Sequence, residues 1–409
     1  MSASSIPPPA AQGNAALAVT LAIQSLGAGA LLTGPVLAPL AAPDIGVEAH
    51  LIGVYVAASY LCASVASLMS GGIMGRLGPL RASQLGLVLC ALGLALGTLD
   101  TPASALASAA LVGFGYGPIT PSSSQILIRT TAPQRLNLVF SLKQTGVPIG
   151  GALAGAVLPS LAEAISWHGA ALATAAVCLV VALAAEPLRK ALDTGLERQR
   201  LFSFARTFGP LAGVMRAPML RLLAFTAFTY AGMQMAMTSF LVTYLSDRLG
   251  MSVPLAGAVL SAALVGGIVG RILWGYLADG IVDPLRLLGV LGLIMSACAV
   301  LVGLFTPAWP LAAIVAIVVA YGATAISWNG VQLAQVARFS PPGRAGETTG
   351  ATTFVTFQGV ALVPFAFSLI LGSIGSYFVA YSGAAVLTLA SGIAYLVAAR
   401  RASRATASR

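Results

Sequence analysis

Two basic residues lie inside long apolar segments of this sequence. Lys143 is part of SLKQTGVPIGG (141–151), and Arg271 is part of GRILWGYLADG (270–280). A cation in the interior of a membrane costs about 3 kcal/mol or more, so it normally contacts a partner or faces a water-filled cavity. Arginine binds a carboxylate through two parallel hydrogen bonds, and lysine adds a compact, movable charge. The two residues therefore predict a site for a small anion.

The composition indicates a membrane protein. The 409 residues are 58% hydrophobic and 8% charged, and their mean hydropathy is +0.93. A soluble domain carries about 25% charged residues, and a transmembrane helix needs about 20 mostly apolar residues. We therefore expect an all-α membrane protein with about twelve transmembrane helices. The predicted spans cover residues 15–41, 49–72, 80–98, 102–128, 137–159, 166–187, 219–245, 253–277, 285–305, 309–336, 348–372 and 378–399.

One polar segment separates these spans into two sets of six. Residues 188–218 are long, basic and polar, whereas the other connections are short. We predict an N-terminal six-helix half at 1–187, a cytoplasmic linker at 188–218 and a C-terminal six-helix half at 219–409. Short repeats support two related halves: YGPITPSSSQ from Tyr116 is similar to YGATAISWNGVQ from Tyr321. Such halves are typical of transporters whose substrate binds between them near the middle of the membrane.

The distribution of basic residues predicts the orientation. With a cytoplasmic N-terminus, 18 of the 21 Lys and Arg residues fall in cytoplasmic loops or the C-terminal tail, and only Arg248 falls in an outer loop. The 18 are Arg76, Arg81, Arg129, Arg135, Arg189, Lys190, Arg198, Arg200, Arg206, Arg216, Arg221, Arg286, Arg338, Arg344, Arg400, Arg401, Arg404 and Arg409. This bias predicts a multi-pass protein of the bacterial inner (plasma) membrane with both termini cytoplasmic. The net charge of +10 then reflects orientation toward anionic lipid rather than a nucleic-acid-binding surface.

The two remaining cations are Lys143 and Arg271. Every Asp and Glu falls in a loop or at a span end, so we expect no acidic side chain in the membrane interior and a substrate that supplies the counter-charge. Each cation lies eight residues from a loop residue, Arg135 or Asp279, which places it about 12 Å into the membrane at 1.5 Å per residue. Two structural roles are alternatives. Lys143 could extend to the lipid headgroups, and Arg271 could hydrogen-bond the backbone of a neighbouring helix.

Residues 270–280 resemble the signature loop between helices 8 and 9 of the major facilitator superfamily of secondary transporters. Gly275 and Asp279 stand at the glycine and the aspartate of that signature, and GGIMGRLGPLR (71–81) is its first-half copy, with Gly75 in place of the aspartate. The resemblance covers nearly the whole chain. It implies two pseudo-symmetric six-helix halves, alternating access and a conformational latch that is weakened in the first half by Gly75. The implied latch residues are Gly71, Arg76, Gly78, Arg81, Gly275 and Asp279.

The resemblance also favours an anion as the substrate. Arg271 stands four residues before Gly275. This place resembles the helix-8 arginine of the monocarboxylate transporters, the oxalate–formate exchanger and the nitrate–nitrite carriers, where it contacts the anion. The monocarboxylate transporters also have an aspartate one turn earlier, and here that position is Gly267. We therefore expect a carboxylate-type substrate without a proton-relay aspartate beside Arg271.

Neutral polar residues within the spans are candidates to orient the substrate, because a buried amide without a partner is costly. Asn329 and Gln358 are favoured, and Asn329 belongs to a polar cluster, SWN (327–329), inside a predicted span. Gln24 belongs to the wider set of polar span residues but not to the predicted site. The predicted substrate-binding residues are Arg271, Lys143, Asn329, Gln358, Gln144 and Tyr116.

Two other functions stay open on the sequence. The chain could move a neutral or amphipathic metabolite, a vitamin or a drug, with both cations structural. It could also be a membrane receptor or scaffold that has lost transport. No Ser-His-Asp set, metal-ligand cluster or phosphate-binding loop is visible in the sequence, so we expect no enzyme, no cofactor and no metal. The expected partners are a small-molecule substrate and the lipid bilayer, and the expected oligomeric state is a monomer.

Overall fold

The chain folds into helices throughout the described part. The computed structural model describes residues 10–47, 52–193 and 204–407, and all regular elements in these ranges are helical. The α-helices are α1 (Ala10–Ile45), α2 (Ile52–Leu77), α3 (Pro79–Gly97), α4 (Pro102–Tyr116), α5 (Ile119–Thr130), α6 (Leu136–Gln144), α7 (Gly146–Ala184), α8 (Arg189–Leu192), α9 (Phe204–Arg216), α10 (Pro218–Leu249), α11 (Val253–Gly280), α12 (Pro284–Gly303), α13 (Leu311–Ala325), α14 (Asn329–Phe339), α15 (Ala345–Ile374) and α16 (Tyr377–Ala407). Two 3-10 helices, η2 (Pro133–Arg135) and η3 (Glu186–Leu188), connect them.

The helices are long and apolar enough to cross a membrane many times. Within the described ranges, 10 helical segments meet this condition, or 11 if α9 and α10 count as one bent span. One of these segments, Pro133–Leu192, is 60 residues long, and its backbone leaves the helical conformation at Ser166, where φ is 80°. Because this segment therefore holds two crossings, and α10 adds another, the described helices account for the twelve predicted spans. The predicted all-α membrane fold is confirmed.

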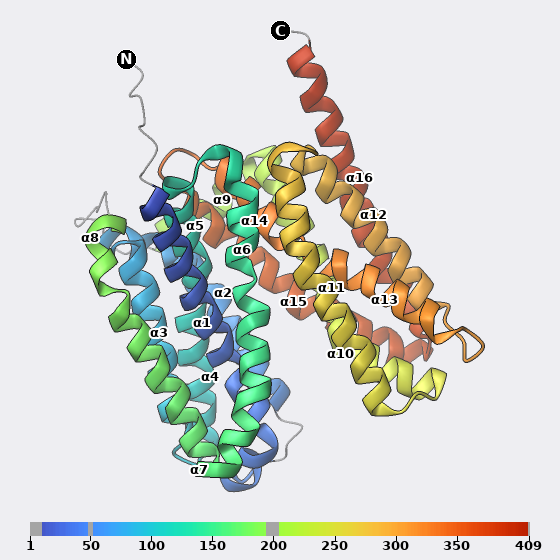
Figure 1. The fold of residues 1–409 in the computed structure, drawn as a ribbon, viewed down its shortest axis with the longest axis horizontal. Helices are drawn as coiled ribbons and strands as arrows, with labels where there is room; N and C mark the ends of the chain where they lie inside the picture. Colours follow the sequence, from blue (N-terminus) through green and yellow to red (C-terminus); the bar gives the residue numbers. More distant parts are fainter. Residues whose placement is uncertain (1–9, 48–51, 194–203, 408–409) are drawn as a thin grey trace. The chain divides into compact units, whose positions relative to one another are not determined.

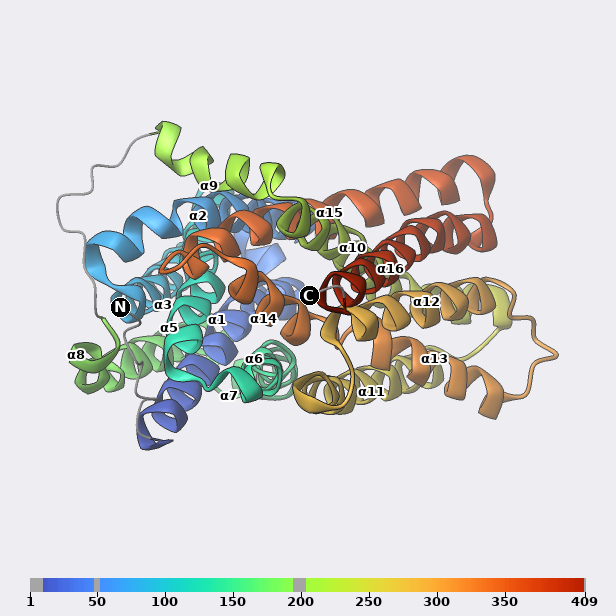
Figure 2. The same ribbon diagram turned by 90° about the horizontal axis from the view of Figure 1, so that it is seen from above.

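The helices pack into two compact units. Unit 1 comprises Met1–Val139, Lys143–Arg216 and Val336–Phe354, and unit 2 comprises Phe140–Leu142, Ala217–Gln335 and Val355–Arg409. In unit 1, α1 packs on α7, and α3 packs on α4 and α7 (Figure 1). In unit 2, α12 packs on α16, and α11 packs on α13 (Figure 2). The predicted boundaries of the two six-helix halves stay a prediction.

Glycines allow the closest helix contacts within each unit. In unit 1, a Cβ atom on Gly150 of α7 would collide with the main-chain oxygen of Ser25 in α1. In unit 2, a Cβ atom on Gly322 of α13 would collide with the main-chain oxygen of Ala263 in α11. Helices in lipid associate largely through close van der Waals packing, which small residues permit. These contacts fix the positions of α1 and α11, the helices that carry Gln24 and Arg271.

Two predicted spans of the first half are interrupted by short breaks in the helix. The predicted span at 102–128 breaks after Tyr116, and α4 and α5 lie on either side of the break. Pro118 lies in the break itself, and neither Pro118 nor Pro121 has an N–H group to bond the carbonyl oxygen one turn earlier, so the helical ladder is interrupted. The predicted span at 137–159 breaks at Thr145 between α6 and α7, where the proline of GVPIGG removes a ladder hydrogen bond in the same way.

A span of the second half is interrupted at the place that matches the first repeat. The predicted span at 309–336 is divided into α13 and α14 by a turn at residues 326–328. No proline lies there, and side chains bond the carbonyl groups near the turn instead. Trp274 Nε1 donates to the oxygen of Ala323 at 2.7 Å. Interrupted helices at matching positions of two repeats are typical of transporter binding sites, because irregular backbone inside a membrane needs a cavity or protein partners.

Candidate functional site

Lys143 is buried inside unit 1. Its side chain is 1% exposed, near the end of α6. The ammonium nitrogen Nζ donates to Gln24 Oε1 at 2.5 Å, to Gln144 Oε1 at 3.0 Å and to Thr120 Oγ1 at 3.5 Å. All three acceptors are uncharged oxygens that replace water around the charge. In this structure the side chain therefore lies within the protein rather than extending to the lipid headgroups.

Gln24 organises the group of polar residues around Lys143. It is fully buried in α1. Its Oε1 also accepts from Thr120 Oγ1 at 3.1 Å, and its Nε2 donates to Tyr116 OH at 3.4 Å. Because both ends of the carboxamide are bonded, its oxygen is held toward the ammonium. We call this group the Lys143 cluster; its members are Gln24, Tyr116, Thr120, Lys143 and Gln144.

The helix breaks explain how the Lys143 cluster forms. Tyr116 ends α4, and Thr120 lies at the start of α5 beyond the break. Lys143 and Gln144 end α6, directly before the break at Thr145. The structure thus brings together three predicted residues, Lys143, Gln144 and Tyr116. It adds Thr120, which was not predicted, and Gln24, whose only signal in the sequence is a lone amide in the middle of a predicted span.

Arg271 is buried inside unit 2. Its side chain is 1% exposed on α11, and its Nε donates to the main-chain oxygen of Ile326 at 2.9 Å. This carbonyl lies in the turn that separates α13 from α14, where the helical ladder is interrupted. The bond fixes the plane of the guanidinium group next to irregular backbone. A hydrogen bond from Arg271 to the backbone of a neighbouring helix is also what its alternative, purely structural role predicts.

Asn329 begins α14 and carries an unsatisfied amide oxygen. The residue is half-buried, and its buried Oδ1 has no hydrogen-bond partner among the described residues. An unpaired buried acceptor costs about 1–3 kcal/mol, so this oxygen suits a donor from a ligand or from water. Gln358, the other favoured amide, is half-buried on α15.

Comparison with a family model decides which family has this fold and these loops. The model of the Major Facilitator Superfamily matches residues 16–364. The chain belongs to the major facilitator superfamily. Two uncharacterized MFS-type transporters of Mycobacterium tuberculosis, from strains CDC 1551 and H37Rv, are each 25% identical to it over 253 residues, 59% of this chain. The chain matches 52% of the length of these curated relatives, about half.

Solved structures share the superfamily fold along almost the whole chain. The E. coli fucose:proton symporter has a TM-score of 0.75 at 18% identity, covering 93% of this chain and 98% of its own. The human organic anion transporter MFSD10 has a TM-score of 0.76 at 16% identity, covering 95% and 100%. A bacterial homologue of the iron transporter ferroportin has a TM-score of 0.75 at 16% identity, covering 94% and 98%. At these identities the likeness concerns the fold alone.

The first-half signature loop of the superfamily is held by an aspartate from outside the signature. Gly78 has φ of 95°, a conformation that glycine adopts without strain, and a Cβ atom there would collide with Asp193. The Asp193 carboxylate accepts from the backbone N–H groups of Leu80 at 2.6 Å and Arg81 at 3.2 Å. A negative charge is favourable at this helix N-terminus. Burial nevertheless raises the pKa of Asp193, against these two hydrogen bonds.

Arg81, another predicted latch residue, joins α3 to the end of the first six spans. Its two terminal nitrogens donate to the two carboxylate oxygens of Glu186 at 2.9 and 3.2 Å. Gln84 Nε2 donates to the same carboxylate at 3.0 Å. Both charged side chains are about two-fifths exposed (39% and 43%), so solvent screens the ion pair and it contributes little to stability. The Arg81–Glu186 pair therefore links α3 to η3 but adds little to the free energy of unfolding.

The other predicted latch residues lie at or near the two signature loops, between α2 and α3 and between α11 and α12. In unit 1, a Cβ atom on Gly71 of α2 would lie 2.5 Å from Cγ of Glu347 on α15, and Arg76 is half-buried at the end of α2. In unit 2, Gly275 is buried on α11, and Asp279 is half-buried near its end. Glu347 is thus the acid that packs against the loop in which Gly75 replaces the signature aspartate. The latch role itself stays a prediction.

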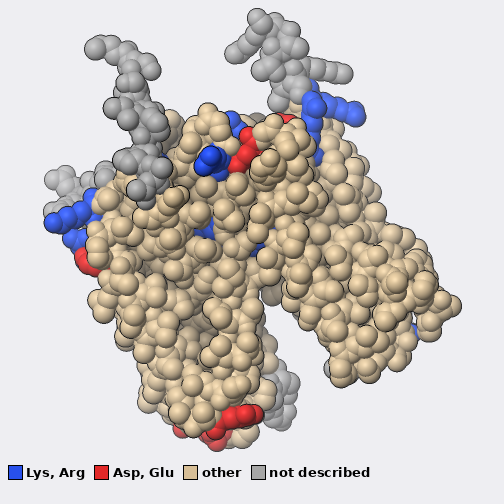
Figure 3. Space-filling view, viewed as in Figure 1, with Lys and Arg blue, Asp and Glu red and all other residues tan. Residues whose placement is uncertain are grey.

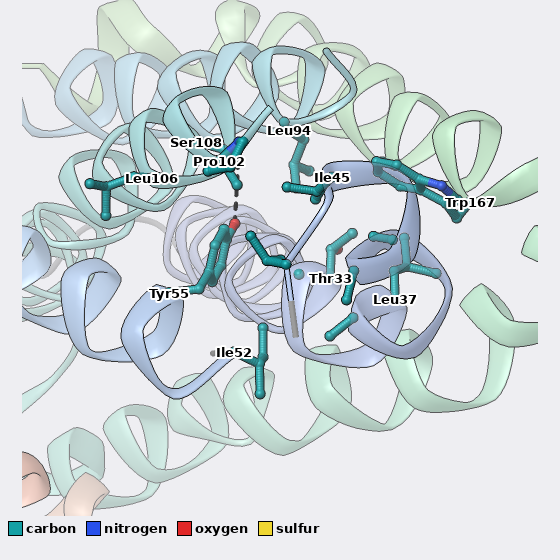
Figure 4. A pocket seen from close by; sticks show the side chains of 18 of the residues that line it. Thr33, Leu37, Ile45, Ile52, Tyr55, Leu94, Pro102, Leu106, Ser108 and Trp167 are labelled. Carbon is teal, nitrogen blue, oxygen red and sulfur yellow. Dashed lines mark hydrogen bonds between the residues drawn. The ribbon is translucent and has the colours of Figure 1, made fainter. Parts of the chain in front are cut away.

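A second feature of unit 1 is an apolar cavity of about 350 Å³. Residues of α1, α2, α3, α4 and α7 line it, among them Leu37, Leu94 and Leu106 (Figure 4). A polar contact on its wall joins Tyr55 OH and Ser108 Oγ at 3.3 Å (Figure 4). The described residues contain no group of three or more His, Cys, Asp or Glu that could hold a metal ion.

Proposed function

We propose that this chain is a secondary transporter that moves a small organic anion of the carboxylate type across a membrane by alternating access. The observation that carries the proposal is the burial of the Lys143 ammonium among uncharged oxygens of Gln24, Gln144 and Thr120. Hydrogen bonds to these oxygens favour the charged form of the ammonium, and its positive potential attracts an anion. Membership of a transporter superfamily supports the transport part of the proposal.

Each predicted residue has a role in this proposal. Lys143 attracts the anion, and Gln144 and Tyr116 orient it. Arg271 binds a carboxylate by its planar guanidinium, whose orientation the Ile326 carbonyl fixes. Asn329 accepts a hydrogen bond from a donor on the substrate, and Gln358 adds a further polar contact. MFSD10, which shares the fold, is named as an organic anion transporter, so the fold accommodates such cargo.

The proposed energy source is a gradient. The acids of the sequence were assigned to loops and span ends, so a proton would enter together with the substrate, or the cycle would be exchange or facilitated diffusion. The proposed location is the bacterial inner membrane with both termini in the cytoplasm, supported by the predicted positions of the basic residues. The proposed working form is a monomer.

Uptake into proteoliposomes tests the proposal. The purified chain is supplied with labelled mono- and dicarboxylates, and wild type is compared with Lys143→Gln, Arg271→Gln and the control Lys190→Gln. Lys190 is the only other lysine of the chain and is exposed. We expect at least a tenfold loss of carboxylate uptake for the first two variants and unchanged uptake for the control. Equal uptake by all four proteins would remove both cations from the site.

A further variant separates charge from fold. Gln24→Glu places a carboxylate where Oε1 now lies 2.5 Å from Lys143 Nζ, so a negative charge then contacts the ammonium directly. We expect the variant to stay folded and to lose carboxylate uptake to the same degree as Lys143→Gln. Full uptake by a folded Gln24→Glu protein would show that the potential of Lys143 does not attract the substrate.

The apolar cavity favours one alternative, a neutral or amphipathic substrate. Its lining is almost entirely apolar, with the Tyr55–Ser108 contact as a polar point. Melting temperatures with a panel of compounds distinguish the two proposals, because a ligand that binds the folded state stabilises it. Carboxylates should raise the melting temperature under the anion proposal, and neutral or amphipathic compounds should raise it under the alternative.

A further inference from the structure

Helix α9 lies in the segment that the sequence predicted as a polar linker. It covers Phe204–Arg216, has the sequence FARTFGPLAGVMR and packs on α2 within unit 1. One residue, Ala217, separates its end from α10, a predicted transmembrane span. The C-terminus of α9 must therefore lie at the membrane boundary, close to the lipid headgroups, if α10 crosses the membrane from its first turn.

The helix presents three distinct faces at 100° per residue. Val214 is 1% exposed, and Thr207 and Pro210 on the same face are half-buried, which makes this the face covered by protein. Phe208 and Met215 lie on a second face and are 39% and 37% exposed. The first face therefore packs against the protein, whereas the second face leaves two large apolar side chains exposed. Packing against the protein does not account for the apolar side chains of the second face.

The second face forms a continuous apolar stripe. Its members follow the spacing i, i+3, i+4 and i+7, which places them side by side along one helix surface. They are Phe208, Leu211, Ala212 and Met215. Ala212 is exposed and Leu211 is half-buried, so the stripe lies at the surface of unit 1 along the length of the helix.

The third face is small and basic. Gly209 and Gly213 are exposed, and a Cβ atom on either would meet nothing within 4 Å, so the space beside them is open. Arg216 is exposed at the end of the helix next to this face. An apolar stripe beside a basic face is typical of helices that lie in the membrane interface.

We propose that α9 lies in the headgroup region of an anionic bilayer leaflet. Phe208, Leu211 and Met215 insert at the boundary of the acyl chains, and Arg216 contacts lipid phosphate groups. Two observations favour lipid over a soluble protein partner: α9 leads into a span after one residue, and the exposed Arg216 lies beside the end of its apolar stripe. The proposal rests on membership of the membrane-transporter family and does not depend on which substrate is carried.

Spin labels on the full chain measure the depth of each face. Cys62 is half-buried and the other three cysteines are buried, so a Cys62→Ala background limits labelling to the introduced sites. Phe208→Cys and its matched control Gly213→Cys are labelled and reconstituted in phosphatidylcholine vesicles with phosphatidylglycerol. We expect the label at 208 to be at least fivefold more accessible to oxygen than to a water-soluble nickel chelate, and the label at 213 to show the reverse. Access of the nickel chelate to the label at 208, or shielding from both reagents by protein or a second copy, would overturn the proposal.

A second measurement tests whether α9 recognises anionic lipid. The same measurement in pure phosphatidylcholine should raise access of the nickel chelate to the label at 208, and Arg216→Gln should remove most of the effect of phosphatidylglycerol. Lys190→Gln serves as the control for net charge, since this exposed lysine lies outside α9. Identical accessibility in both lipid mixtures would refute recognition of anionic lipid. Since no transport is measured, a failure here is distinct from a failure of the proposed anion site.

Discussion

At the scale of single residues, the carboxamide of Gln24 has the most consequences for the candidate site. Its oxygen accepts from both Lys143 and Thr120, while its nitrogen donates to Tyr116. A buried ammonium needs such acceptors, because a charge without them would pay the full cost of desolvation. The structure thus gives Gln24 a positioning role that its sequence context alone did not indicate.

Removal of this acceptor should weaken the fold. Gln24→Leu deletes the oxygen 2.5 Å from Lys143 Nζ, and hydrogen bonds to charged groups contribute about 1.5–3 kcal/mol. We expect the free energy of unfolding in detergent to fall by about that amount. Thr33→Val is the control on the same helix, because the buried Thr33 hydroxyl donates to the carbonyl of Gly29 within α1 itself. Unchanged stability of Gln24→Leu would mean that other groups solvate the ammonium equally well.

Asp193 should make stability depend on pH. Burial raises its folded-state pKa above the usual value, so the folded chain favours the neutral carboxyl group. The resulting stabilisation is fully present below the pKa of the unfolded chain and is lost as the pH rises through the folded-state pKa. Compared with Asp193→Asn, wild type should lose melting temperature as the pH rises above about 4, the usual pKa of an aspartate side chain. A difference that grows in the opposite direction would show that the hydrogen bonds from Leu80 and Arg81 outweigh burial.

At the scale of elements, interrupted helices determine what lies near the cations. The break between α4 and α5 and the break between α6 and α7 both lie next to members of the Lys143 cluster. The turn between α13 and α14 offers the Ile326 carbonyl to Arg271. Close contacts such as that between α1 and α7 hold the interrupted segments in place, since Gly150 lies directly against the Ser25 carbonyl.

Substitutions on α7 test that contact. Gly150→Ala adds a Cβ atom where the main chain of α1 lies, and overpacking of this kind costs about 1–3 kcal/mol. Gly155→Ala, on the same helix, adds a Cβ atom into open space and should be neutral or stabilise by up to about 1 kcal/mol through helix propensity. Unfolding of the two variants in the same detergent measures the difference. Equal stabilities would show that α1 moves away from α7 at little cost.

At the scale of the whole molecule, charge is distributed unevenly along unit 1. At the end of its helices away from the N-terminus, the charged side chains that this view shows are acidic, whereas basic side chains and further acidic ones lie toward the N-terminal end (Figure 3). At the end away from the N-terminus, Asp44 accepts from Trp167 Nε1 at 2.7 Å, and Asp100 pairs with His168 at 2.8 Å. Arg81 and its partners lie where α2 leads into α3, the opposite end of those helices. This asymmetry agrees with the direction that the predicted positive-inside pattern requires.

Reporter fusions test the proposed orientation. A fluorescent protein fused after Arg409 should fluoresce, because it folds in the cytoplasm. Alkaline phosphatase inserted after Asp100, in the turn between α3 and α4, should be active, because it needs the far side of the membrane. The exchange of the two reporters supplies the control, since each should then be inactive. Active phosphatase at the C-terminus would reverse the orientation.

Hydrophobic runs and the spacing of loops were sufficient to predict the fold. Membrane thickness and the need to satisfy every backbone group inside lipid leave few options for such runs, so the all-α architecture follows from local sequence. The superfamily was implied by the resemblance of the loop at residues 270–280 to the signature of that family. The sequence also marked Lys143 and Arg271, because a charge within an apolar run is conspicuous, and both are buried in the structure. It did not predict the interrupted helices, although Pro121 lies in one of them, since an apolar run with a proline can be bent or broken.

Only the tertiary structure decided which groups surround each cation. Gln24 lies 119 residues before Lys143, and Ile326 lies 55 residues after Arg271, so packing between helices brings them together. Which side of a helix faces a cation depends on how the whole helix is rotated about its axis. Close contacts between small residues, such as Gly150 and Ser25, fix that rotation, and no local sequence pattern specifies it. Sequence therefore determined that charges are placed inside the membrane region, and three-dimensional packing determined the uncharged oxygens that hold them.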